Sequence, residues 1–132
     1  MVVLQKLVAH LTRRRPDLIA VYVFGSHARG DSTPHSDVDL ACLTRHKLDP
    51  VERWKLQEEL AVLAGRDVDL VDLRQASTVL RVQILRDARL LLDADAAERA
   101  RFEATALSAY ARLNEERKQI LADVAATGQS GG

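Results

Sequence analysis

The stretch VYVFGSHARGDSTPHSDVDLACL, residues 21–43, has the residue types and spacing with the most direct chemical meaning. An apolar run ends at Gly25-Ser26, and Asp37 and Asp39 open the next apolar run. Glycine lets the backbone approach a ligand closely, and a helix starting near Ser26 would offer N–H groups and a hydroxyl to an anion. This pattern predicts a cradle for the outer phosphates of a nucleotide, although an ordinary strand-to-helix turn also fits it.

The two aspartates strengthen the case for a functional site. Asp37 and Asp39 are two positions apart on a predicted strand, so both carboxylates point to one face. Val38, Leu40 and Cys42 are apolar, which assigns the other face to the core. Neighbouring carboxylates repel each other, and a divalent cation such as Mg²⁺ removes that cost. The alternative is an exposed strand face, where acidic residues need no metal.

A third carboxylate is expected from the later segment DVDLVDL, residues 67–73. Asp69 is the choice, because Asp67 shares its face but lies at the start of the strand. Asp72 faces the other way and is expected to face solvent or to form a structural contact. Asp69 would hold a metal or take the proton from an attacking hydroxyl. Three such acids suit two-metal catalysis, in which one ion activates the nucleophile and the other steadies the leaving pyrophosphate.

Apolar periodicity predicts the elements that must position these residues. Capping residues and helix breakers set several of the boundaries: Asp49 and Pro50, Gly65, Ser77 and Asp95. The expected elements are helices over 2–14, about 50–64, 78–88 and 96–126, and strands over 18–24, 37–43, 67–73 and 90–92. Trp54 is expected to be a core residue. The pattern indicates one α+β domain over residues 1–127 with a small sheet, followed by a disordered tail at 128–132.

Composition excludes several classes of protein. The 132 residues contain 19 basic and 19 acidic residues, so the basic excess of a protein that grips a long nucleic acid is absent. Aromatic residues make up 4%, too few for a base-stacking platform. Cys42 alone cannot form an internal disulfide and is expected to be a small core residue. No signal peptide or membrane span is visible, so a cytoplasmic protein is expected.

The motif resembles the DNA polymerase β-type nucleotidyltransferase superfamily, in particular its minimal (MNT) members. The resemblance rests on Gly25-Ser26, the Asp37-x-Asp39 pair ten residues later, and Asp69 on a later strand. The segments VDLVDLRQA and AYARLNEERKQIL also resemble the antitoxin halves of HEPN–MNT toxin–antitoxin pairs, the MntA type. This resemblance implies the nucleotidyltransferase fold, with a small mixed sheet flanked by helices and a long C-terminal helix.

The resemblance also implies an activity: transfer of AMP from ATP with release of pyrophosphate, using two Mg²⁺ ions. Gly25 and Ser26 would bind the triphosphate, while Asp37, Asp39 and Asp69 would be the metal-binding acids. Relatives often have arginine at the position of His27, so Arg29 is expected to be the remaining basic group on the triphosphate.

The acceptor implied by the resemblance is a tyrosine of a HEPN ribonuclease toxin, whose RNA-cutting site the added AMP would silence. A small-molecule acceptor such as an aminoglycoside remains an alternative, as does a non-catalytic antitoxin that acts by binding alone. Tyr110 lies on an apolar stripe of the last helix, which could pack on the core or bind another chain. Neither a membrane nor direct nucleic-acid binding is expected.

Overall fold

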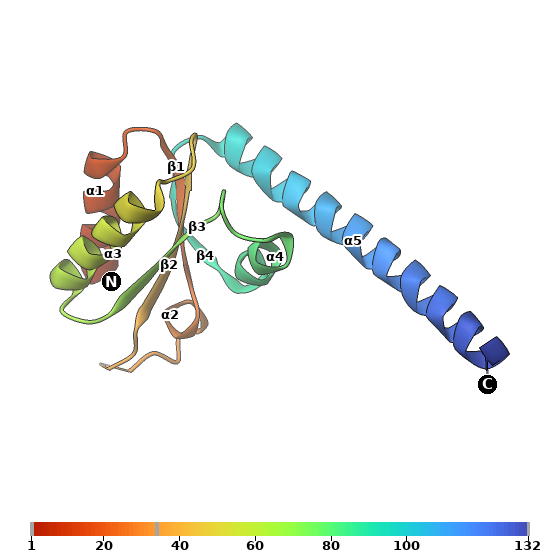
Figure 1. The fold of residues 1–132 in the computed structure, drawn as a ribbon. Helices are drawn as coiled ribbons and strands as arrows, with labels where there is room; N and C mark the ends of the chain where they lie inside the picture. Colours follow the sequence, from red (N-terminus) through yellow and green to blue (C-terminus); the bar gives the residue numbers. More distant parts are fainter. Residues whose placement is uncertain (1, 34, 132) are drawn as a thin grey trace.

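The chain folds around a four-stranded sheet that has helices on both faces (Figure 1). The computed structural model describes residues 2–33 and 35–131. In chain order the elements are α1 (Val2–Arg14), β1 (Leu18–Phe24), α2 (Ser26–Arg29), β2 (Val38–Thr44), α3 (Pro50–Ala64), β3 (Val68–Asp72), α4 (Thr78–Asp87), β4 (Arg89–Asp93) and α5 (Ala96–Gly131). The predicted α+β class, with a small mixed sheet and a long last helix, is confirmed.

The strand order is β3-β2-β1-β4, which places β1 and β2 in the middle of the sheet. Strand β1 is antiparallel to both of its neighbours, and β2 is parallel to β3. Val21 and Val23 of β1 belong to one buried cluster, and Ile19 and Tyr22 belong to another. Both faces of β1 are therefore covered, which explains why its sequence is an almost continuous apolar run.

Helices α1 and α3 cover one face of the sheet, and α4 and the start of α5 cover the other (Figure 1). Helix α1 buries Leu4, Leu7 and Leu11, the spacing of a single helix face. Helix α5 buries Phe102 and Ala106 near its start and then extends well beyond the domain (Figure 1). In the described part of the chain, no helix has both the length and the apolar character needed to cross a membrane.

The predicted helix caps are present. Asp49 accepts hydrogen bonds from the backbone N–H groups of Val51 and Glu52 at the start of α3, and Gly65 ends that helix with a φ of 67°. From its spacing, Glu52, three positions after Asp49, is also expected to complete a capping box, but its carboxylate accepts from Arg15 instead. Two further side chains cap α4 and α5 as expected: Ser77 accepts from Leu80 N at 3.1 Å, and Asp95 accepts from Glu98 N at 3.2 Å.

The structure shifts several predicted boundaries. Strand β2 begins at Val38, so Asp37 lies directly before the strand, because pairing with β3 starts at Val38. Strand β3 ends at Asp72, one residue inside the predicted segment at each end. Helix α5 continues through Gly131, past the predicted end near Ala126. The division into a domain of residues 1–127 and a disordered tail therefore stays a prediction, and Gly132 lies outside the described residues.

Two expectations about the core have different outcomes. Cys42 is 1% exposed in the core, as predicted, and burial raises the pKa of its thiol to about 12. Trp54 was predicted to be a core residue, and that prediction is wrong, because its side chain is 54% exposed. Helix α3 buries Leu56 and Leu60, and a residue two positions before Leu56 lies about 200° away around the helix.

A partly buried ion pair between Arg15 and Asp17 connects the residues before β1 to the loop after β2. Arg15 Nε and Nη2 donate to the two carboxylate oxygens of Asp17, each at 2.8 Å, and His46 N donates to Asp17 Oδ2 at 3.2 Å. The Arg15 bonds lower the pKa of Asp17 from 3.8 to about 2, although burial acts in the opposite direction.

Replacing this carboxylate should reduce stability in a pH-dependent way. We expect Asp17→Asn to lower the free energy of unfolding at pH 7 by about 2 kcal/mol, since each pKa unit corresponds to about 1.4 kcal/mol. The folded-state pKa is the lower one, so this stabilisation is complete above pH 3.8 and is lost as the pH falls toward 2. Urea denaturation of the natural chain and of Asp17→Asn, at pH 7 and at pH 3, measures this difference in the free energy of unfolding. Glu115→Gln, which removes an exposed pair with Lys118, is the control; an Asp17→Asn effect of equal size at both pH values contradicts the prediction.

Candidate active site

The turn after β1 has a backbone conformation that favours glycine. Gly25 has φ 70° and ψ −149°, a region that residues with a Cβ rarely adopt. Ala28 N and Arg29 N both donate to Gly25 O at 3.2 Å, which folds the chain directly into α2. The helix begins at Ser26, as predicted, and ends at Gly30 after a single turn.

The carboxylate of Asp39 lies directly against this turn. Phe24 and Asp39 are partners across β1 and β2, so the residue after Phe24 is brought beside Asp39. A Cβ added to Gly25 would lie 2.3 Å from Asp39 Oδ2, far inside any permitted contact distance. Only a residue without a side chain therefore allows this acid and this turn to sit together. The predicted cradle and the predicted acidic strand do meet at this point.

Asp37 and Asp69 bring further negative charge to Asp39. Asp39 pairs in register with Asp69 on the parallel strand β3, and Asp37 lies two residues earlier in the chain. Burial of the half-buried Asp39 raises its pKa, and the charges of Asp69 and Asp37 raise it further, while His27 and Arg29 act in the opposite direction. Asp37 and Asp69 are themselves exposed. Asp37 and Asp69, the other two acids named from the sequence, thus both lie within electrostatic reach of Asp39.

The segment before Asp37 is held in place by short contacts. Thr33 N donates to Ser36 Oγ at 2.8 Å, and Ser36 N donates back to Thr33 O at 3.0 Å. Val38 N donates to Asp67 O at 3.0 Å, which fastens the start of β2 to the start of β3. These contacts fix where Asp37 leaves the loop, and sequence analysis did not anticipate them.

The donor set fits a divalent cation. Within residues 2–33 and 35–131, no three His, Cys, Asp or Glu side chains are gathered closely enough to hold a metal by themselves. Mg²⁺ does not require such a cage, because it binds one or two carboxylates together with substrate phosphates and water. Burial raises the pKa of Asp39 most, and the negative charges of Asp69 and Asp37 raise it further; a cation would offset the repulsion from those charges. The assignment of Asp37, Asp39 and Asp69 as ligands stays a prediction.

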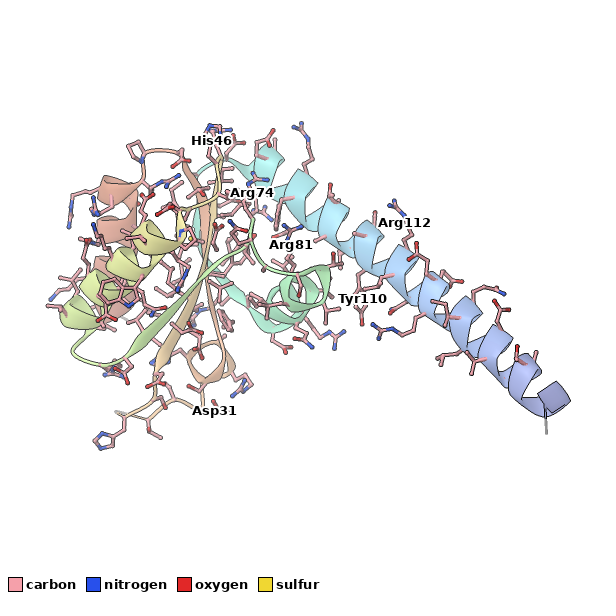
Figure 2. The ribbon with its side chains drawn as sticks, in the orientation of Figure 1. Asp31, His46, Arg74, Arg81, Tyr110 and Arg112 are labelled. Atoms are coloured by element: carbon pink, nitrogen blue, oxygen red, sulfur yellow. The ribbon has the colours of Figure 1, made fainter. Side chains whose placement is uncertain are left out.

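The two basic residues near the turn have different environments. Arg29 is exposed, and its Nε donates to Asp31 Oδ2 at 3.3 Å. Figure 2 shows Asp31 at the end of the molecule near α2, with His46 at the opposite end. His27 is only 5% exposed, and neither of its ring nitrogens has a hydrogen-bond partner among the residues that the structure describes. Arg29 is therefore the more accessible cation for an incoming ligand.

Asp72, the remaining acid of the predicted strand segment, has a structural role. Its side chain is 2% exposed, and it accepts from Leu48 N at 2.7 Å and from Arg74 N at 3.0 Å. These bonds join the end of β3 to the loop before α3. The expected structural contact is confirmed, and the alternative of a solvent-facing Asp72 is wrong.

A hollow of about 250 Å³ opens beside the turn, and sequence analysis did not identify it. We call it the α4 hollow. It lies between the end of β1 and helix α4, and is lined by Phe24, Gly25, Arg29, Leu80, Gln83, Ile84 and Asp87. The only sequence signal was the helical spacing of the four α4 residues, which places them on one face. A roomier hollow of about 470 Å³ lies between α1 and β4, and none of its lining residues belongs to the Gly25 turn.

The comparisons with known proteins agree with this geometry. The family model "Polymerase beta, Nucleotidyltransferase" matches residues 5–97. The protein adenylyltransferase MntA of Shewanella oneidensis is 38% identical over 121 residues, which covers 92% of this chain and 86% of that protein.

Two solved structures also resemble the whole chain. A toxin–antitoxin structure with AMP-PNP is 38% identical, with a TM-score of 0.82, and the match covers 91% of this chain and 96% of that one. A tri-AMPylated Shewanella oneidensis HEPN toxin in complex with an MNT antitoxin contains a chain that is 35% identical, with a TM-score of 0.78 and coverage of 93% and 96%. Together with the Gly25–Asp39 geometry, these matches show that the chain belongs to the polymerase β-type nucleotidyltransferases and, within them, to the minimal members of the MntA type.

Proposed function

We propose that this chain is an antitoxin that neutralises a HEPN ribonuclease toxin by transferring AMP from ATP to one of the toxin's tyrosines. The observation that carries the proposal is the Asp39 carboxylate lying against the Gly25 turn, which puts an acid beside the expected triphosphate site. Three of the matches support the nucleotide and the acceptor: a protein adenylyltransferase, a complex with a tri-AMPylated HEPN toxin, and a structure with AMP-PNP.

The residues of the site have distinct tasks in this reaction. Gly25, Ser26 and Arg29 would hold the triphosphate, and Asp37, Asp39 and Asp69 would hold two Mg²⁺ ions. When bound, Mg²⁺ supplies positive charge that offsets the charge of the phosphates and of the clustered acids. Asp37 and Asp69 are exposed, so a large protein substrate can reach these two acids from solvent.

The transfer itself exchanges one phosphorus–oxygen bond for another. The tyrosine oxygen bonds to the α-phosphorus, and the bond from that phosphorus to the oxygen bridging to the β-phosphate breaks. Pyrophosphate leaves with the electron pair. The phenol proton passes to a base, and Asp69 is the candidate because it is exposed and lies in register beside Asp39. The added AMP places bulk and negative charge beside the toxin's RNA-cutting site, which blocks RNA binding.

A protein acceptor also needs a docking surface, and the outer half of α5 offers one. Three apolar side chains in this outer half are more than half exposed and lie within about 100° of one another around the helix: Ile120, Leu121 and Val124. Figure 1 shows this part of α5 extending away from the sheet and from every other helix. An exposed apolar stripe of this kind is typical of an interaction surface. We assign it to the HEPN toxin, since the similar chains that cover this helix were solved as toxin complexes.

Labelled ATP tests the reaction directly. With the chain, its cognate toxin, Mg²⁺ and ATP labelled in the α-phosphate, we expect label on a toxin tyrosine. Asp37→Asn and Asp39→Asn should each reduce the transfer rate by roughly 1,000-fold or more, because several kcal/mol of transition-state stabilisation depend on the metal-binding acids. Removing Mg²⁺ with EDTA should have a similar effect. Glu58→Gln, an exposed acid on α3, should transfer at the natural rate.

The other outcomes identify the alternatives. Label found only on an added aminoglycoside would indicate a small-molecule transferase. Toxin inhibition that persists in the Asp37→Asn, Asp39→Asn double variant, with no label on any acceptor, would indicate an antitoxin that acts by binding alone.

The contact at Gly25 gives a second prediction with a matched control. Gly25→Ala should reduce transfer at least about 100-fold, because its Cβ would displace the Asp39 carboxylate as well as strain the backbone. Gly65→Ala also places a Cβ at a positive φ, 67°, but in the left-handed helical region (ψ 24°) and with open space around it, so it is the milder control. Gly65→Ala should lose about 1 kcal/mol of stability and Gly25→Ala more, measured by thermal unfolding, and only Gly25→Ala should lose activity. Equal activity in the two variants would refute this role of the contact.

The docking surface gives a third prediction. The Ile120→Glu, Val124→Glu double variant should weaken toxin binding at least tenfold, measured by calorimetry, since it places charges on the apolar stripe. Its affinity for ATP should not change. Ala111→Glu is the control, because residue 111 is exposed and lies opposite Ile120 around the helix. If the double variant binds the toxin with the same affinity as the Ala111→Glu control and the natural chain, the toxin does not dock on this part of α5.

A further inference from the structure

The α4 hollow shares two of its lining residues with the expected triphosphate site. Gly25 forms the turn, and Arg29 is the accessible cation beside it. A nucleotide whose phosphates lie on this turn is therefore next to the hollow. We infer that the α4 hollow binds the adenine ring and ribose of ATP, with Gln83 recognising the base. This inference rests on the proposed function, since it takes the Gly25 turn as the phosphate site.

The walls of the hollow suit a flat aromatic ring. Phe24, Leu80 and Ile84 provide apolar surface, and Leu80 is 38% exposed although it lies beside the buried Ile84 cluster. Ligand sites combine mostly apolar walls with a few polar groups that fix orientation. The planar guanidinium of Arg29 can also stack on a base face while its charge remains near the phosphates.

The polar residues of the hollow match the edges of adenosine. Gln83 and Asp87 are one helical turn apart on α4, so their side chains lie on the same face. Both are exposed, and neither has a hydrogen-bond or ion-pair partner within the described ranges of the chain. A glutamine amide offers one acceptor and one donor, which pairs with the N6 amino group and the N7 atom of adenine.

Guanine presents a different edge, with two acceptors at N7 and O6. The amide NH₂ of Gln83 can donate to that edge, but the amide oxygen of Gln83 finds no donor there. Asp87 is an acceptor for ribose hydroxyls, the use that dinucleotide sites make of an acidic residue. Gln83 therefore accounts for preference between bases, whereas Asp87 contributes to the affinity of any ribonucleotide.

Three probes separate these contributions: ATP, GTP and inorganic tripolyphosphate, each titrated into the full chain in the presence of Mg²⁺ by calorimetry. Gln83→Ala should weaken ATP binding about tenfold, equivalent to one lost hydrogen-bonded group, while GTP binding stays the same. Asp87→Asn should weaken ATP and GTP equally, by severalfold. Tripolyphosphate, which has neither base nor ribose, should bind all variants alike. Arg86→Ala is the control, because Arg86 is exposed on α4 but lies outside the hollow.

Two outcomes would overturn the inference. The first is that Gln83→Ala leaves the ratio of ATP affinity to GTP affinity unchanged. The second is that Gln83→Ala weakens tripolyphosphate binding as much as it weakens ATP binding. In either case the natural chain would still transfer AMP to the toxin, and the proposed function would stand. If the natural chain binds no nucleotide and transfers no AMP, the proposed function fails and this inference fails with it. The transfer assay on the natural chain therefore distinguishes the two failures.

Discussion

The close approach of the Asp39 carboxylate to the Gly25 backbone is the constraint on which the site depends. Gly25 must have a positive φ to turn the chain out of β1, and it must lack a Cβ so that Asp39 Oδ2 can lie against it. These are two independent requirements for glycine at one position. They join the turn that would hold phosphates to the acids that would hold metal, so neither half of the site can move without the other.

The sheet maintains this approach by its register. Val38 and Leu40 are fully buried on either side of Asp39, and a slip of one residue would turn them toward the site and the acid toward the core. The arrangement costs stability, because burial and two neighbouring acids raise the pKa of Asp39. Apolar clusters on both faces of the sheet offset that cost. A strained, charged site on a well-packed scaffold is a common compromise between stability and function.

Sequence reasoning located the Gly25 turn and the acid-bearing strand because the determining pattern is local: a buried strand, a breaker and an alternating strand follow one another within one short stretch. The structure brings Gly25 and Asp39 together, whereas the binding roles of Gly25, Ser26, Asp37 and Asp39 stay predictions. Sequence reasoning failed where distant elements decide the outcome. The α4 hollow exists only because α4 packs beside the end of β1, and Trp54 was misplaced because α3 has more apolar residues than one face can bury.

The attachment of α5 to the sheet fixes the direction in which the helix carries the proposed docking surface away from the site. Phe102, near the start of the helix, lies under the guanidinium groups of Arg74 and Arg81, at 5.4 and 5.1 Å from the ring centre. Both guanidinium groups are fixed in turn: Arg74 Nε donates to Thr44 O and Arg81 Nε to Leu73 O, each at 2.7 Å. Figure 2 shows Arg74 and Arg81 beside the first part of α5, with Tyr110 and Arg112 farther along it.

This attachment fixes the base of α5 to the ends of β2 and β3, the same two strands that carry Asp39 and Asp69. A partner bound to the outer part of the helix is therefore held in a fixed relation to the acids. Because the effective concentration of an acceptor depends on such a fixed relation, under the proposed function binding energy gained on α5 would favour transfer to a tyrosine of that partner over transfer to other proteins. Specificity for the acceptor can thus reside on α5, apart from the groups that carry out the chemistry.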